Sequence, residues 1–223
     1  MKMTKKKVFV AALAICLVAI ASVGTLAWFN ATDSVENKFM ITDSETDADK
    51  VFSVELYETK VDENGDPVDP AETTKSNTYD NIAPGDVLTK DPTVKNTGKY
   101  DQWIRLNVTL TDAADWMSIL QYCGITTLET VFQGYDADAW QSEGNDAPVL
   151  NADGTMTFTY YLKDKLTPGE TATLFTAVKI PEKISQDEIV YVNEFNINIV
   201  AQALQADNTG DSAKAAFDAY WGQ

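Results

Sequence analysis

The chain has 223 residues, of which 17 are basic, 34 are acidic and none is histidine, so its formal charge at pH 7 is −17. An acidic surface of this kind repels nucleic acid and anionic lipid, which excludes nucleic acid as a partner. Because Arg105 is the only arginine, few side chains are available for bidentate recognition of phosphate, and phosphate-handling chemistry is disfavoured.

The first 27 residues have the pattern of a secretory signal peptide. Four lysines among the first seven residues precede an apolar run over residues 8–20, and small residues are frequent from there to Ala27. This order predicts cleavage next to Ala27 or Trp28, removal of residues 1–27 and export of residues 28–223 as one domain. The four lysines leave with the signal and no acid does, so the exported domain would carry a charge of about −21.

A membrane anchor is the alternative interpretation of the same segment, since no charged residue lies between Lys7 and Asp33. A membrane-spanning helix needs about 20 mainly apolar residues. Ser22, Gly24 and Thr25 interrupt the second half of the run, and the uninterrupted part has the length of a signal-peptide core. We therefore expect contact with a membrane only through the signal peptide, before it is cleaved.

Residues 28–41, which follow the predicted cleavage position, have the period of a half-buried β-strand. Polar residues occupy the even positions from 30 to 38, and apolar residues recur at the odd positions. A strand at a new N-terminus is held at one end only, so it can pair within its own domain or with a neighbouring subunit. We expect these apolar positions to contact another subunit: Phe29, Ala31, Val35, Phe39 and Ile41.

Several segments farther along also alternate with period two, and turn residues such as Asn64-Gly65 separate them. Their one-sided apolar residues are Phe52, Val54 and Leu56; Ile104, Leu106, Val108 and Leu110; Met156, Phe158, Tyr160 and Leu162; Leu174, Val178 and Ile180; and Tyr191, Phe195, Ile197 and Ile199. Many short strands with turns between them predict an all-β fold, an antiparallel β-sandwich of jelly-roll or Greek-key type.

Two places change to the spacing of a helix. Apolar residues stand at i, i+3, i+4 and i+7 from Trp116 to Cys123, and Gly124 follows as a stop signal. Residues 212–221 have the same spacing after Ser212, which predicts a short closing helix that packs on the sandwich.

Two similar turns occur far apart in the chain. Pro84-Gly85-Asp86 and Pro168-Gly169-Glu170 each precede a segment with threonine. Proline fixes one turn torsion and glycine permits the next. Either a weak internal repeat or two uses of one turn type in a sandwich explains the similarity.

Five sequence blocks lie at both ends and in the middle of the chain. The block at the predicted processing position is Gly24-Thr25-Leu26-Ala27-Trp28-Phe29-Asn30-Ala31-Thr32-Asp33-Ser34-Val35, followed by Asn37-Lys38-Phe39. The other blocks are Ile82-Ala83-Pro84-Gly85-Asp86, Lys90-Asp91-Pro92-Thr93-Val94-Lys95-Asn96-Thr97-Gly98, Trp103-Ile104-Arg105-Leu106-Asn107-Val108 and Ala201-Gln202-Ala203-Leu204-Gln205-Ala206-Asp207. Together, in this order, these blocks resemble the TasA and camelysin family of secreted proteins.

The resemblance implies a jelly-roll-like domain that a signal peptidase of the SipW type releases to the surface of a Gram-positive-like bacterium. Members of that family assemble into fibres of the biofilm matrix, in which each subunit donates an N-terminal strand to the next. The implied partners are other copies of the chain and accessory matrix or wall components. The acidic stretch 42–50 and the long hairpin around Gly65 depart from the family pattern, so the register of a donated strand does not follow from the resemblance.

The camelysin name carries a protease label, which the residues of this chain do not support. Without histidine, neither a His-Glu-x-x-His zinc site nor a Ser-His or Cys-His nucleophile pair can form. The Asp-Thr-Gly and Asp-Ser-Gly tripeptides of aspartic dyads do not occur in the sequence. Cys123 lies on the apolar side of a predicted helix, where a core position is expected. We therefore expect a protein that is not an enzyme and needs no cofactor.

Calcium binding is an alternative for one predicted turn, where Asp62, Glu63, Asp66 and Asp69 lie close together in the sequence. Carboxylates suit calcium, but this spacing does not match the twelve-residue calcium loop. Solvation of a hairpin tip is the preferred interpretation.

A non-polymerising surface adhesin or glycan-binding protein is the alternative function. Its stacking platforms would be the rings of Trp103, Tyr135 and Trp140. Packing within the sheets is the preferred interpretation of these rings.

Overall fold

The computed structural model describes residues 30–34, 52–79, 82–111, 113–125, 131–143, 151–184 and 196–221, and the predicted signal peptide lies outside them. The described strands are β1 (Asn30–Ser34), β2 (Val54–Thr59), β3 (Thr73–Thr74), β4 (Val87–Thr89), β5 (Thr93–Asn96), β6 (Gln102–Leu110), β7 (Phe132–Gln133), β8 (Trp140–Ser142), β9 (Met156–Leu162), β10 (Thr171–Thr173), β11 (Ala177–Lys179) and β12 (Ile197–Gln205). The described helices are α2 (Ala113–Tyr122) and α4 (Ala213–Trp221). Neither of them is long and apolar enough to cross a membrane.

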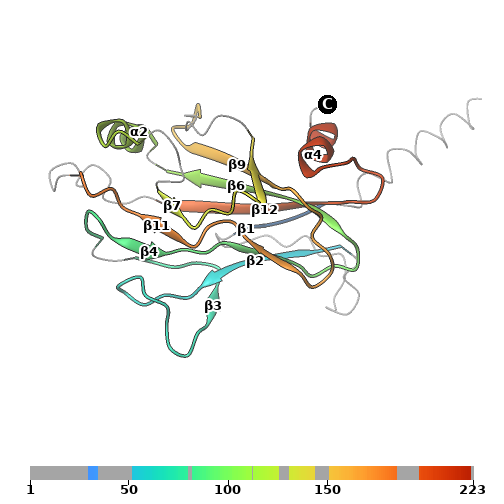
Figure 1. Cartoon of the computed structure of the whole chain (residues 1–223), viewed down its shortest axis with the longest axis horizontal. Helices are drawn as coiled ribbons and strands as arrows, with labels where there is room; N and C mark the ends of the chain where they lie inside the picture. Colours follow the sequence, from blue (N-terminus) through green and yellow to red (C-terminus); the bar gives the residue numbers. More distant parts are fainter. Residues whose placement is uncertain are drawn as a thin grey trace, which may run out of the picture.

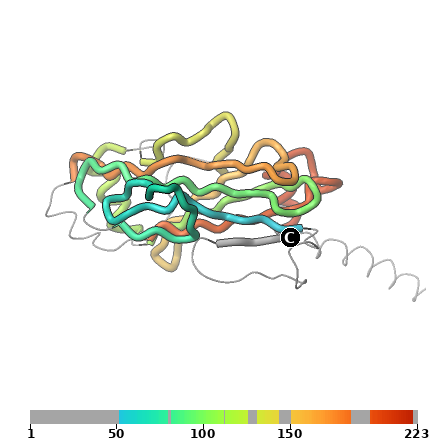
Figure 2. The backbone as a smooth tube through the Cα atoms, turned by 90° about the horizontal axis from the view of Figure 1, so that it is seen from below, coloured from blue at the N-terminus to red at the C-terminus, as the bar shows by residue number. Residues whose placement is uncertain are grey.

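The strands form three antiparallel sheets, whose long strands run along the longest axis of the molecule (Figures 1 and 2). The five-stranded sheet has the order β1-β12-β6-β9-β8. The four-stranded sheet has the order β10-β5-β2-β3, and the three-stranded sheet has the order β4-β11-β7. The predicted all-β antiparallel sandwich with short helices is therefore confirmed, while its jelly-roll or Greek-key connectivity stays a prediction.

The alternation in β6 creates the main core. Ile104, Leu106 and Val108 are fully buried on one face, whereas Arg105 and Asn107 between them are only half-buried. The inward residues belong to one cluster with buried residues of the two smaller sheets, which therefore face the five-stranded sheet across a shared core.

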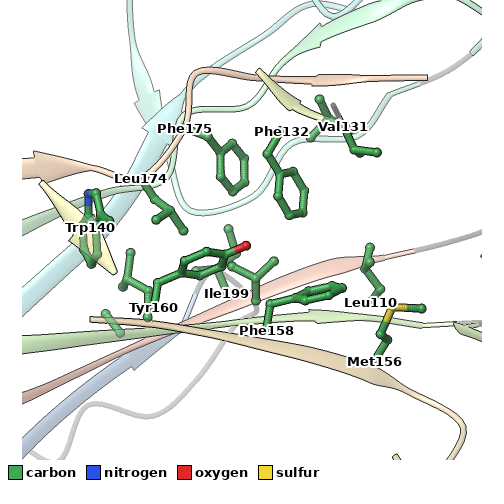
Figure 3. Close-up of a cluster of buried hydrophobic side chains, with 14 of the residues drawn as sticks. Leu110, Val131, Phe132, Trp140, Met156, Phe158, Tyr160, Leu174, Phe175 and Ile199 are labelled. Carbon is green, nitrogen blue, oxygen red and sulfur yellow. The ribbon is translucent and has the colours of Figure 1, made fainter. Parts of the chain in front are cut away.

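Aromatic rings fill the middle of this core (Figure 3). Phe132 and Phe175 stack with a centroid separation of 4.4 Å and an interplanar angle of 5°. Phe158 of the five-stranded sheet meets Phe132 edge-on at 6.3 Å and 84°. Such pairs contribute about 0.5–1.5 kcal/mol beyond the area that they bury, so these rings hold the two layers together.

The closing helix α4 covers part of the outer face of the five-stranded sheet. Ala213, Ala216 and Phe217 form a second buried cluster with Trp103 and Tyr161, which lie on the sheet face away from the main core. The hydroxyl of Ser212 accepts a hydrogen bond from the backbone N–H of Ala215 at 3.3 Å, as expected of a residue that begins a helix.

Helix α2 lies where the apolar spacing predicts it. Trp116, Ile119 and Leu120 are buried, and Cys123 is buried directly after the helix. Gly124 has a φ of +70°, and the following N–H, of Ile125, donates to the carbonyl of Leu120 at 2.9 Å. This left-handed stop explains why the helix ends at a glycine.

The two Pro-Gly turns lie beside two antiparallel ladders of different sheets, β4 with β11 and β5 with β10. The N–H of Gly85 donates to Ile180 at 3.0 Å, and the N–H of Gly169 donates to Asn96 at 2.9 Å. In each turn the glycine N–H thus donates to a backbone carbonyl next to or at the end of the partner strand. The similarity of the two turns therefore agrees with two uses of one turn type, since each glycine also has a positive φ, +94° at Gly85 and +86° at Gly169.

Candidate subunit-pairing edge

Strand β1 is the edge strand of the five-stranded sheet (Figure 1). It pairs antiparallel with β12 over five residues, in a register that places Asn30 opposite Leu204 and Ser34 opposite Val200. On its other side β12 pairs with β6 over nine residues. Among the described residues, the ladder with β1 therefore covers only part of the edge that β12 offers.

The structure places one of the predicted subunit-contacting residues. Ala31 lies opposite Ala203, which is fully buried on the core side of β12. The other predicted contact residues, and both residues at the predicted cleavage position, lie outside the described residues: Ala27, Trp28, Phe29, Val35, Phe39 and Ile41. In the single chain the N-terminal strand pairs within its own domain. Pairing with a neighbouring subunit is the other arrangement that the sequence analysis allows.

Strand β12 is also held by contacts that do not involve β1. Besides its ladder with β6, the side chain of Gln202 accepts hydrogen bonds from Arg105 Nε at 2.8 Å and from Asn107 Nδ2 at 3.2 Å. The carboxamide oxygen of Asn107 then accepts a bond from the Thr159 hydroxyl of β9 at 2.9 Å. These polar contacts join three strands on the outer face, so β12 offers a preformed surface to any strand that pairs with it.

The free energy that attaches β1 is small. Ladder hydrogen bonds contribute about 0.5–1.5 kcal/mol net each, and ordering a residue costs about 1–2 kcal/mol. For a five-residue ladder these two amounts nearly cancel, so side chains beyond the ladder must decide whether the strand stays in place. An edge strand balanced in this way is suited to exchange.

The aromatic rings that would have served a glycan-binding site are largely unavailable. Trp103 is 4% exposed and Trp140 is 1% exposed, and the indole N–H of Trp140 donates to the carbonyl of Thr173 at 2.9 Å. Tyr135 is half-buried and packs against Tyr160 at 5.6 Å. The preferred interpretation, packing within the sheets, is therefore confirmed for both tryptophans, because α4 covers Trp103 and the sandwich encloses Trp140.

The acidic turn is organised by its own hydrogen bonds. The carboxylate of Asp62 accepts the N–H groups of Asn64 at 2.9 Å and Asp66 at 3.1 Å, and these bonds lower the pKa of the exposed Asp62. Within the described part of the chain, no group of three or more acidic or cysteine side chains is placed to hold a metal ion. The geometry thus agrees with the preferred interpretation, a capped hairpin tip.

A buried polar cluster near β2 was missed by the sequence analysis. Glu58 is fully buried and Lys90 is 6% exposed, and Lys90 Nζ lies 2.6 Å from Glu58 Oε1. The available signal was the alternation of β2, because Glu58 occupies the next position on the face that Val54 and Leu56 share. A carboxylate on the core face of a strand requires a partner.

A scan against protein-family models, a search of curated proteins and a search of solved structures each found no match. The resemblance to the TasA and camelysin family therefore stays a prediction.

Proposed function

We propose that this chain is an exported structural protein that assembles into extracellular fibres. Each subunit donates its N-terminal strand, residues 28–41, to the β12 edge of the next subunit. In the isolated chain the same strand folds back on its own β12 and protects that edge until another copy replaces it.

The observation that carries the proposal is the pairing of β1 with β12 at the edge of the five-stranded sheet. The same backbone groups and the same buried residue, Ala203, would meet the strand of another copy, because the two strands have the same sequence. Exchange of an identical element between subunits needs no new interface. When the exchange is head-to-tail it does not close on itself, and an open filament results.

The estimated energies favour assembly only with a complete ladder. Burial of Phe29, Val35, Phe39 and Ile41 contributes about 6–12 kcal/mol, whereas ordering the thirteen residues 29–41 costs about 13–26 kcal/mol. Ladder hydrogen bonds at about 0.5–1.5 kcal/mol each must supply the remainder. Because each subunit is strongly acidic, salt, divalent cations and falling pH should all promote fibre growth.

The direct test is deletion of residues 28–41 behind a replacement signal peptide. We expect a folded, secreted monomer that forms no fibres in electron microscopy, since the donor is missing while the acceptor edge is intact. A synthetic peptide of residues 28–41 should bind this truncated protein, and a peptide with the same residues in scrambled order should not. Fibre growth of the truncated protein at the rate of the complete mature chain would refute the proposal.

A further inference from the structure

Two side chains from separate parts of the chain, those of Lys90 and Asn77, meet at the buried carboxylate of Glu58. Lys90 Nζ donates to Glu58 Oε1 at 2.6 Å, and Asn77 Nδ2 lies 3.4 Å from Glu58 Oε2. One carboxylate thus holds an amine on one oxygen and a carboxamide on the other. Lys90 follows β4, Asn77 follows β3, and Glu58 lies in β2.

The carboxamide of Asn77 is fixed by two further hydrogen bonds. Its Nδ2 donates to the carbonyl of Thr59 at 2.8 Å, and its Oδ1 accepts the backbone N–H of Val61 at 3.1 Å. The amide is therefore held with its oxygen on a backbone donor and its nitrogen beside a carboxylate. An attack on the amide carbon requires both: a donor beside the oxygen, where negative charge develops, and an acid beside the nitrogen that leaves.

The amine and the acid are shielded from water, since Glu58 is fully buried and Lys90 is 6% exposed. Leu56, which precedes Glu58 on the same face of β2, and Leu88, two residues before Lys90, are both buried in the main core. In such a place a charged pair costs desolvation energy, so a proton can pass between the two groups with little penalty. A lysine without its extra proton is the nucleophilic form.

We propose that Lys90 and Asn77 become joined by an isopeptide bond, with Glu58 as the proton carrier. Glu58 Oε1 takes a proton from Lys90 Nζ, and Nζ then attacks Cγ of Asn77. The negative charge that develops on Asn77 Oδ1 is stabilised by the N–H of Val61. Glu58 returns a proton to Nδ2 through Oε2, the bond from Cγ to Nδ2 breaks, and the ammonia that leaves takes the surplus proton of Nζ and becomes ammonium.

The overall step balances without an oxidant or a co-reactant. One ammonium group and one primary amide become one secondary amide and one ammonium ion, and Glu58 ends in the state in which it began. The product ties residue 77 to residue 90, so it fastens the segment after β3 to the junction of β4 and β5. This modification is independent of fibre assembly, because none of its residues belongs to the β1–β12 edge.

The test is the mass of the secreted mature chain, with its N-terminus fixed by sequencing. We expect a mass lower than the calculated one by one ammonia. Digestion at aspartate, at Asp80 and Asp86 between the two residues, should leave two peptides that remain joined through Lys90 and Asn77. A chain with the calculated mass and separable peptides would overturn the proposal.

Variants assign the roles of the three residues. Lys90→Arg and Asn77→Ala should each restore the calculated mass, and so should Glu58→Gln, which keeps both reacting groups but removes the proton carrier. Asn77→Asp should lose one water in place of one ammonia, a signature that follows only from attack at this carbon. Peptide mapping of the complete chain measures the mass and the cross-link in all four variants, even where a variant is less stable.

Asn64-Gly65 supplies the matched control, because an asparagine before glycine can also lose ammonia by forming a cyclic imide with its own backbone. Asn64→Ala should leave the mass loss of the complete chain unchanged. Disappearance of the loss in Asn64→Ala, with persistence in Lys90→Arg, would assign the loss to the turn and overturn the isopeptide bond.

Discussion

The two sheet edges formed by β1 and β3 are secured in different ways. At the five-stranded sheet, β1 is attached by a ladder of five residue pairs to a strand near the other end of the chain. At the four-stranded sheet, β3 makes only two pairs with β2, yet the segment after it is fixed by Asn77 to Thr59, Val61 and the buried Glu58. Strand β1 is thus held by a short backbone ladder, whereas the segment after β3 is also anchored at a buried carboxylate, so we expect β1 to be the easier of the two to exchange.

The largest expected effect comes from stranding one charge at the fixed edge. Replacing Glu58 by leucine leaves Lys90 buried without its carboxylate, and we expect a loss of about 3–5 kcal/mol in the free energy of unfolding. The double variant Glu58→Leu with Lys90→Met should recover the part of that loss that comes from the stranded ammonium, because it removes both charges and keeps the volume apolar, while both variants lack the proposed isopeptide bond. Urea unfolding of the three proteins measures both differences. Equal stability of the single and double variants would show that the charge is not what holds this edge.

The second prediction locks the exchangeable edge. Ala31 and Ala203 are directly opposite, and Cα atoms in such positions are about 4.5–5.5 Å apart, which suits a disulfide. Ala31→Cys with Ala203→Cys should give an oxidised monomer that is stabilised by about 2–4 kcal/mol and forms no fibres until it is reduced.

The same pair of cysteines distinguishes a swapped strand from a retained one. Fibres grown under reduction and then oxidised should contain subunits joined into covalent ladders on a non-reducing gel, because each Ala31 position would lie on a neighbour's β12. A control with Ala31→Cys and Asn198→Cys, whose β12 position lies outside the ladder, should not cross-link. Monomeric bands from oxidised fibres of the first variant would contradict strand donation.

Tyr79 gives a smaller effect with a defined pH dependence. Its hydroxyl donates to the carbonyl of Thr89 at 2.6 Å, and burial, followed by the charge of Glu58, raises its pKa. A raised pKa in the folded state means that the contribution to stability is complete below the unfolded value, about 10, and is lost as the pH rises above it. Tyr79→Phe should cost about 0.5–1.5 kcal/mol at pH 7, and its stability should fall less steeply than that of the wild type above pH 10 in urea unfolding. Parallel curves for the two proteins would rule out Tyr79 as the titrating group.

The sequence was sufficient for features that depend on local periodicity. The alternation of β6 predicted its buried face from Ile104 to Leu110, and the spacing before Gly124 predicted α2. Pairing between distant strands has no such local signal, because register depends on which faces meet in the folded chain. That is why the N-terminal strand could be predicted as exchangeable while its own partner, β12, could not be named.

The buried pair of Glu58 and Lys90 could not be predicted from the sequence for a related reason. In the sequence pattern Glu58 is the polar residue that ends an alternating run, although it lies on the same face of β2 as Leu56. Its partner Lys90 is 32 residues away, and no motif links the two. Only the folded arrangement shows that a glutamate and a lysine, each typical of a surface, satisfy one another inside the sandwich.

A second lysine–glutamate pair, exposed to solvent, is the comparison for the buried site of Lys90 and Glu58. Lys60 Nζ lies 2.6 Å from Glu72 Oε2, the same separation as in the Lys90–Glu58 pair, but its side chains are 49% and 54% exposed. Exposed pairs contribute about 0–1 kcal/mol, so Lys60→Ala should change the urea midpoint little and should lose what effect it has in high salt. Lys90→Ala, in contrast, should destabilise the protein severely at every salt concentration. If the two variants behaved alike, neither the burial of Lys90 nor its proposed bond to Asn77 would stabilise the protein, and the segment after β3 would be no better anchored than the exposed Lys60–Glu72 pair.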